Sequence, residues 1–203
     1  DKNSLYSPIS LYYALAMLEA GTAGKTKTDL RAFMAIPDSM QIGNELRNLY
    51  ALMTRDGKES AEQIANAIWF REDLISDSKK IIKQDWLDQL SNDFYASAFK
   101  VDFKNSETAK RMSGWVEEQT KGKIKPEIDL SEPDLLIVLM NTLYFKADWV
   151  TPFEDDSIQK DSSYGVKNTI ADVPYLTGLF QSLTVLREDR YQACALPLMN
   201  GHI

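Results

Sequence analysis

The most strongly apolar stretch of the chain lies at residues 135–140, where every position is hydrophobic. A run this short is typical of a β-strand that is covered on both faces. Asn141 interrupts the run, and residues 142–146 again suit a strand. The pattern therefore predicts a long interior strand with one amide near its middle. Because an unpaired buried polar group costs about 1–3 kcal/mol, another part of the chain must form hydrogen bonds with Asn141.

Helical signals dominate the chain before this strand. Ser7 is a good helix cap, and Pro8 at the first helical position loses no needed N–H. Apolar residues then recur at helical spacing as far as Gly21. Other helices are predicted near 26–35, 44–53, 77–90 and 106–120, and strands at 3–6, 63–71 and 96–103. Short strands follow near 164, 172–176, 183–186 and 192–198, so the order of elements predicts an α+β fold.

Composition narrows the function classes. The chain has 203 residues, with 44% hydrophobic and 26% charged residues, which is ordinary for a globular protein. A net charge of −7 argues against a nucleic-acid partner, because phosphate binding needs clustered Lys and Arg. No apolar run of about 20 residues is present, so we expect no membrane-spanning segment.

Candidate catalytic residues are poorly supported. His202 is the only histidine and lies next to the last residue, where a rigid catalytic arrangement is rare. Cys194 is the only cysteine and sits in an apolar strand pattern, which favours a small core residue over a nucleophile. Because no His/Cys cluster exists, we expect no metal site and no cofactor. We predict that the protein is not an enzyme.

Two motifs resemble the serpins, the serine protease inhibitor superfamily. The first is LMNTLYFKADW at residues 139–149, followed by Pro152 and Phe153, with Ala147 where the family usually has Gly. The second is NSLYSPIS at residues 3–10, followed by ALAM at 14–17 and GTAGKT at 21–26. The resemblance runs over essentially all 203 residues. It implies one serpin-like domain over 1–203, with multi-stranded sheets and packed helices but without the later strands.

The resemblance also implies two functional regions. Ser7, Ser10 and Asn141 match a cluster beneath the main sheet of serpins, whose hydrogen bonds control strand separation. The two serines lie three positions apart, so both hydroxyls share one face of the helix start. They can pair with a strand amide without blocking a neighbouring strand. The alternative is polar pairing with no gating role.

The second region is the top of the main sheet, where the reactive loop of serpins begins to insert. Phe145, Lys146 and Trp149 match this region. For Trp149, the residue pattern by itself favours a core aromatic at the strand end over a surface anchor for a partner.

The mechanism that the resemblance implies is suicide inhibition of serine or cysteine proteases. The protease cleaves an exposed loop, becomes acylated, and is trapped when that loop inserts as a new strand. In serpins this loop lies near the C-terminus, beyond Ile203, so the reactive bond is absent from this chain. We expect a fragment, a truncated form or one of two chains, the second chain supplying the C-terminal strands. By itself the chain should be inactive.

Two other functions stay open. The first is that of a non-inhibitory serpin, which acts as a carrier, storage protein or chaperone. The hinge of the reactive loop would discriminate it from an inhibitor, since small hinge residues permit insertion and bulky or charged ones oppose it. The second is an unrelated α+β binding module. An extracellular location is favoured by the family resemblance only.

Overall fold

The computed structural model describes residues 6–58, 60–76, 82–154, 156–180 and 182–199. They divide into two compact units, which are described separately. The larger unit contains residues 7–56 and 61–145, and the smaller one contains residues 57–60 and 146–203 together with 1–6. The expectation of one domain over 1–203 stays a prediction.

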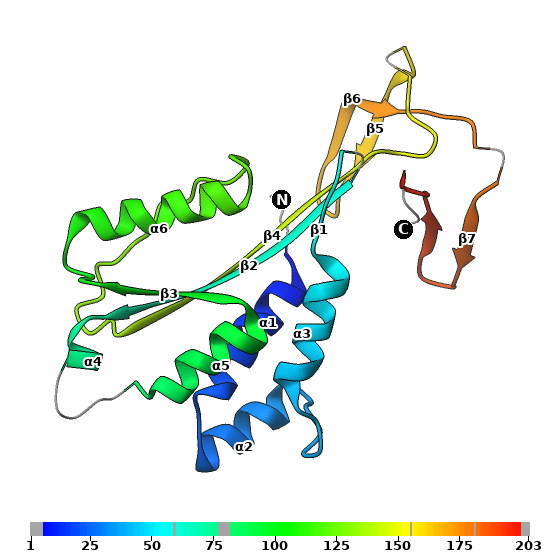
Figure 1. The fold of residues 1–203 in the computed structure, drawn as a ribbon. Coiled ribbons are helices and arrows are strands. Elements are labelled where there is room, and N and C mark those ends of the chain that lie inside the picture. The colour runs from blue at the N-terminus through cyan, green and yellow to red at the C-terminus, as the bar shows by residue number, and fades with distance from the viewer. Residues whose placement is uncertain (1–5, 59, 77–81, 155, 181, 200–203) are drawn as a thin grey trace. The chain divides into compact units, whose positions relative to one another are not determined.

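Helices and a mixed sheet build the larger unit, which agrees with the predicted α+β class (Figure 1). The helices are α1 (Pro8–Ala20), α2 (Gly24–Phe33), α3 (Ile42–Met53), α4 (Asp73–Ser76), α5 (Gln84–Phe94) and α6 (Ser106–Gln119). The strands are β1 (Arg55–Asp56), β2 (Ser60–Arg71), β3 (Ala96–Val101) and β4 (Ile137–Ala147). β2 pairs antiparallel with β1 and parallel with β3, and β4 also pairs with β2.

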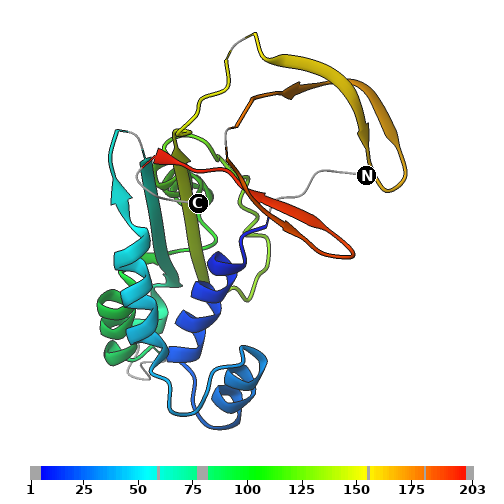
Figure 2. The ribbon, with the colours of Figure 1, turned by 90° about the vertical axis from the view of Figure 1, so that its right-hand side faces the viewer.

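Both faces of this sheet are covered. Helices α1, α3 and α5 lie on one face and α6 lies on the other (Figures 1 and 2). Alternate residues of β4 follow this division, because successive side chains of a strand point to opposite faces. Leu139 and Leu143 pack into the core cluster that contains Tyr13, and Val138 and Met140 pack into the cluster beneath α6. The sequence prediction of a strand covered on both faces is confirmed.

The interior strand of the described sheet is β2 rather than β4. Ala67, Ile68, Trp69 and Phe70 of β2 are at most 2% exposed. β4 is only partly buried along most of its length, and among the described strands it pairs with β2 alone. The prediction that this segment is an interior strand is therefore wrong for this chain. The apolar pattern reported the two covered faces but carried no information about the strand's edges.

The capping residues in the sequence predicted where α1 and α6 begin. Ser7 caps α1 by accepting the N–H of Ser10 at 3.3 Å, and Pro8 is the first helical residue. Asn105 caps α6 by accepting the N–H of Glu107 at 3.0 Å. The predicted 77–90 helix is wrong in its bounds, because α5 begins at Gln84 and ends at Phe94. Residues 77–81, and most of the strand predicted at 3–6, lie outside the described residues.

The smaller unit contains two antiparallel strand pairs. β5 (Ile158–Tyr164) pairs with β6 (Thr169–Leu176), and β7 (Thr184–Arg187) pairs with β8 (Gln192–Ala195). Cys194 of β8 is exposed, so its prediction as a core residue is wrong. The residues of β7 and most of β8 are exposed as well, because a two-stranded ribbon needs a further layer to bury either face. Among the described helices, none is long and apolar enough to cross a membrane.

Candidate functional site

Two asparagines from neighbouring strands form the polar centre of the main sheet. The side-chain nitrogen of Asn141 in β4 donates to Oδ1 of Asn66 in β2 at 2.7 Å. The side-chain nitrogen of Asn66 in turn donates to the carbonyl of Phe94, the last residue of α5, also at 2.7 Å. Asn66 is only 1% exposed. These bonds connect β4 through β2 to a helix on one face of the sheet.

The predicted hydrogen-bond partners of Asn141 were wrong. Ser10 donates its hydroxyl to Ser7 Oγ at 3.0 Å, in addition to its capping N–H. The structure therefore pairs the two serines with each other, and Asn141 with Asn66. Because the cap already engages the Ser7 hydroxyl, local helix capping competes with any longer-range bond.

Sequence reasoning missed Asn66, although its signal resembles that of Asn141. Asn66 is a single amide between Ile64 and Ile68 on the same face of a predicted strand. An isolated amide in an otherwise apolar strand requires a partner. Two strands that each carry one such amide are natural partners, but the register that aligns them is set by the folded sheet.

Two buried oxygens at this centre have no hydrogen bond among the residues that the structure describes. Oδ1 of Asn141 is buried and unpaired among the described residues, as is Oγ1 of the neighbouring Thr142. An unpaired buried acceptor costs about 1–3 kcal/mol. A donor group brought to Oδ1 of Asn141 would therefore stabilise the sheet.

Within the described part of the chain, β4 also has a free edge. Arg71 N–H bonds to the Leu136 carbonyl, and Asn66 bonds to Asn141, so β2 and β4 run in opposite directions. β3 pairs with the same stretch of β2, which places β4 on the other side of that strand. No other described strand pairs with β4. The outer edge of β4 thus presents backbone N–H and C=O groups that can accept an added strand.

Helix α1, which carries the two serines, is tied to α3 beneath the sheet. The buried hydroxyl of Tyr13 donates to the Leu46 carbonyl at 2.7 Å. Burial, with a smaller contribution from Tyr50, raises the pKa of Tyr13 to about 12. The tyrosine therefore stays neutral and keeps its donated bond over the whole physiological pH range.

The residues predicted for the top of the sheet are all exposed. Phe145 and Lys146 lie near the end of β4, and Phe145 is 52% exposed. Trp149 belongs to the smaller unit, where its ring meets that of Phe153 edge to face at 5.8 Å and its backbone pairs with Leu198. Trp149 is 40% exposed, so the prediction of a core aromatic is wrong. The role of these three residues in loop insertion stays a prediction.

The arrangement defines a class of protein: an α+β protein whose main sheet is covered on both faces and has an open edge. Comparison with known proteins gives the family. The family model described as Serpin (serine protease inhibitor) matches residues 1–203. The chain belongs to the serpin family.

Relatives and solved structures agree with this assignment. Thyroxine-binding globulin of Sus scrofa is 31% identical over 182 residues, covering 87% of this chain and 43% of that protein. Alpha-1-antitrypsin 1-5 of Mus musculus is 29% identical over 180 residues, covering 86% and 42%. The thermophilic serpin tengpin in its latent state superposes with a TM-score of 0.83 at 27% identity, covering 99% of this chain and 53% of tengpin. The chain thus spans about half the length of the relatives it matches.

Proposed function

We propose that the protein containing this chain inhibits serine or cysteine proteases by inserting its own cleaved loop beside β4. The observation that supports this proposal best is the free edge of β4, with the unpaired buried acceptor of Asn141 at its centre. The reactive loop and later strands would come from outside these 203 residues, either from a longer chain or from a second chain. This chain by itself would not inhibit.

The proposed reaction begins with ordinary proteolysis. The serine or cysteine of the target protease attacks a loop carbonyl, the peptide bond breaks, and the new amine leaves with the C-terminal part of the loop. The N-terminal part remains bound as an acyl-enzyme. When it inserts beside β4, backbone hydrogen bonds form along the free edge, each contributing about 0.5–1.5 kcal/mol. That gain offsets the distortion of the attached protease, which cannot then complete hydrolysis.

The proposed gate is the polar centre of the sheet. The Asn141–Asn66 bond ties β4 to β2, on the side away from the free edge. Ser7 and Ser10, which bond to each other at the start of α1, are proposed as further members of the gate. Phe145, Lys146 and Trp149 are the proposed entry region for the loop.

A gel assay tests inhibition. The full-length protein is mixed with a panel of serine and cysteine proteases and run under denaturing conditions. A covalent complex with at least one protease is expected. The matched control is the same protease with its nucleophile blocked beforehand, which must give no complex. Cleaved protein without a complex for every protease tested would contradict the proposal.

A carrier function is the second candidate. Several relatives are thyroxine-binding globulins, and one matching solved structure is thyroxine-binding globulin in complex with thyroxine. A carrier would bind a small aromatic ligand of this kind and would form no protease complex. Titrating the full-length protein with thyroxine while following tryptophan fluorescence tests the idea, and saturable quenching is expected for a carrier. An unchanged fluorescence signal, together with a covalent protease complex, would rule against the carrier function and support inhibition.

The proposed location of the protein rests on the family resemblance alone. An extracellular location suits an inhibitor or a carrier of this family. Nucleic acid is not a proposed partner, because the net charge is −7. A membrane partner is not proposed either.

A further inference from the structure

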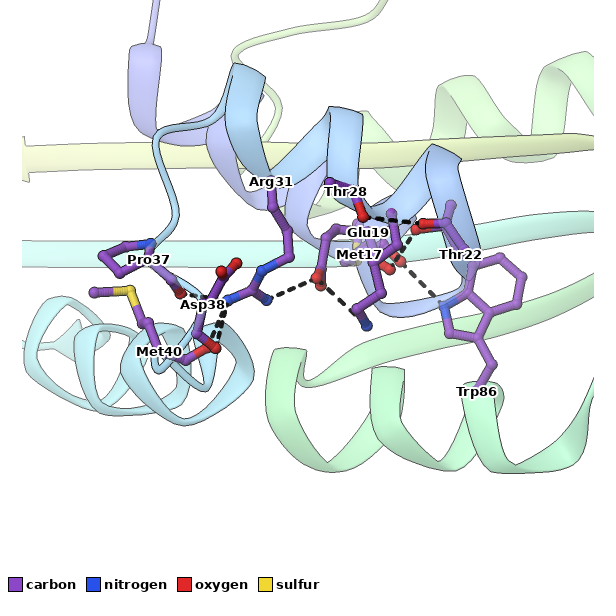
Figure 3. A network of polar contacts seen from close by, with 11 residues as sticks. Met17, Glu19, Thr22, Thr28, Arg31, Pro37, Asp38, Met40 and Trp86 are labelled. Carbon is purple, nitrogen blue, oxygen red and sulfur yellow. Dashed lines mark hydrogen bonds and ion pairs between the residues drawn. The ribbon is translucent and has the colours of Figure 1, made fainter.

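A buried carboxylate lies at the C-terminal end of α1. Glu19 is 2% exposed, and its Oε1 lies 2.9 Å from Nη1 of Arg31 and 3.4 Å from Nζ of Lys27 (Figure 3). Both cations come from α2. A carboxylate in the last turn of a helix faces the negative end of the helix dipole, and burial penalises its charge further. Glu19 is therefore held in this position by its partners on α2.

Arg31 also binds the turn that follows α2. Its Nη2 donates to the carbonyls of Pro37 at 2.5 Å and Met40 at 3.0 Å, with a longer contact to Asp38 at 3.5 Å. Figure 3 shows the guanidinium between these carbonyls and Glu19. One side chain thus joins the end of α1, helix α2 and the segment that leads into α3.

Helix α5 binds the same end of α1 from another direction. The indole N–H of Trp86 donates to the Met17 carbonyl at 3.0 Å. Gly21, just after the helix, lies so close to the Trp86 ring that a Cβ would come within 2.5 Å of it. Thr22 Oγ1 donates to the Glu19 carbonyl at 2.8 Å. Carbonyls in the last turn of a helix lack intrahelical partners, and here Met17 and Glu19 obtain them from these contacts.

The other end of α1 begins beside Ser7, which caps it, and carries Ser10. Ser7 and Glu19 are separated by about 18 Å along a helix that rises about 1.5 Å per residue. Between them, Tyr13, Ala16 and Met17 pack in the same core cluster as Leu139 and Leu143, the β4 residues two positions either side of Asn141. A tilt of α1 at its C-terminal end would therefore shift the packing under Asn141.

We propose that the Glu19–Arg31 pair positions α1 and thereby limits the rate at which the free edge of β4 accepts another strand. The proposal deepens the proposed function, on which it rests for the role of the edge. Glu19 and Arg31 are positioning residues, since they act through α1 and the core cluster beneath β4. Strand acceptance can be followed without a protease, because a second copy of the protein can supply the strand and produce polymers.

The test compares polymer formation in full-length variants. Glu19→Gln, Arg31→Met and the double variant are incubated at the same interval below each variant's own Tm, and polymers are followed on non-denaturing gels. Lys25→Met controls for the loss of a cation, because Lys25 is an exposed α2 residue paired with Asp29. Val101→Ala controls for lost stability, because Val101 is buried in the cluster on the opposite face.

Each single variant is expected to form polymers about tenfold faster than both controls, a typical size for coupling between two sites. The double variant should form polymers more slowly than Arg31→Met, because it removes the buried carboxylate that Arg31→Met leaves with the longer Lys27 contact. Single variants no faster than Val101→Ala would overturn the proposal, since a purely structural pair changes the rate only through stability. Faster polymer formation without any covalent protease complex in the wild type would overturn inhibition and support the positioning role.

Discussion

At the scale of residues, two single amides in apolar strands form the polar centre of this sheet. Asn66 and Asn141 each would be costly alone, because a buried amide must replace the hydrogen bonds that water gave it. In the folded sheet Asn141 donates a hydrogen bond to Asn66, and the side-chain nitrogen of Asn66 donates to the Phe94 carbonyl. The side-chain oxygen of Asn141 has no partner among the described residues, so hydrogen bonding at the centre of the sheet is incomplete there.

The effects of replacing Asn66 and Asn141 on the free energy of unfolding should not be additive, because replacing one asparagine alone leaves the other without its partner. Asn141→Ala is expected to lower the free energy of unfolding by about 1–3 kcal/mol, because it leaves Oδ1 of Asn66 unpaired, and to promote polymer formation. A double-mutant cycle with Asn66→Ala should show a coupling energy of about 0.5–3 kcal/mol. Denaturant unfolding measures each variant, with the exposed Asn48→Ala as control. An unchanged free energy of unfolding for Asn141→Ala would remove its proposed role.

Tyr13 gives a pH prediction with a definite sign. Its pKa is raised by burial from 10.0 to about 12, so the neutral form is favoured in the folded state. The stabilisation is complete below pH 10 and is lost as the pH rises towards 12, because only the unfolded chain ionises this tyrosine in that interval. Unfolding measured from pH 9 to 12 should show a shallower loss of stability for Tyr13→Phe than for wild type. Tyr164→Phe, at a residue 80% exposed, should follow wild type; identical slopes for Tyr13→Phe and wild type would contradict the assignment.

At the scale of elements, residues next to a helix end fix where the helix begins. Ser7 and Asn105 cap their helices with their own side chains. Packing then separates positions that look alike in the sequence. Gly43 and Gly114 both lie within helices, but only at Gly43 does a neighbour fill the space that a side chain would need.

These two glycines should respond oppositely to alanine. Gly114→Ala in α6 is expected to stabilise the protein by up to about 1 kcal/mol, because alanine favours helix and its Cβ would meet no atom within 4 Å beyond the backbone of its own helix. Gly43→Ala in α3 should destabilise it, since its Cβ would lie 2.6 Å from a carboxylate oxygen of Asp93. Thermal unfolding of both variants tests the pair. Equal shifts in the same direction would show that packing does not distinguish the sites.

At the scale of the larger unit, the free edge of β4 is the dominant feature. β2 has neighbours on both sides, whereas β4 has one described neighbour. The edge is the proposed site of loop insertion in the whole protein, and in this chain by itself it also favours pairing between copies. The same backbone groups therefore account for the proposed function and for a tendency to aggregate.

Hydrogen exchange should distinguish the two strands. In the dilute, monomeric 203-residue chain, β4 amides that point away from β2 should exchange rapidly, because no described strand accepts them, while the amides of β2 should be protected. Amide exchange resolved by residue measures the contrast. Raising the protein concentration should protect the β4 amides as copies pair. Uniform protection of β4 at every concentration would contradict the free edge.

The two motifs in the amino-acid sequence carried the resemblance to the serpins. The residue pattern by itself determined the α+β class, the cap of α1 and the two covered faces of β4. These properties depend on local chemistry and on the period of apolar residues, which can be read along the chain. The tertiary structure alone decided that Asn66 pairs with Asn141, that β4 forms an edge, and that Cys194 and Trp149 are exposed. The physical reason is that register and burial are properties of segments brought together from distant parts of the chain, as 75 residues separate the two asparagines. A strand pattern shows which faces are apolar, but not which neighbour lies along its edge or what covers a ribbon.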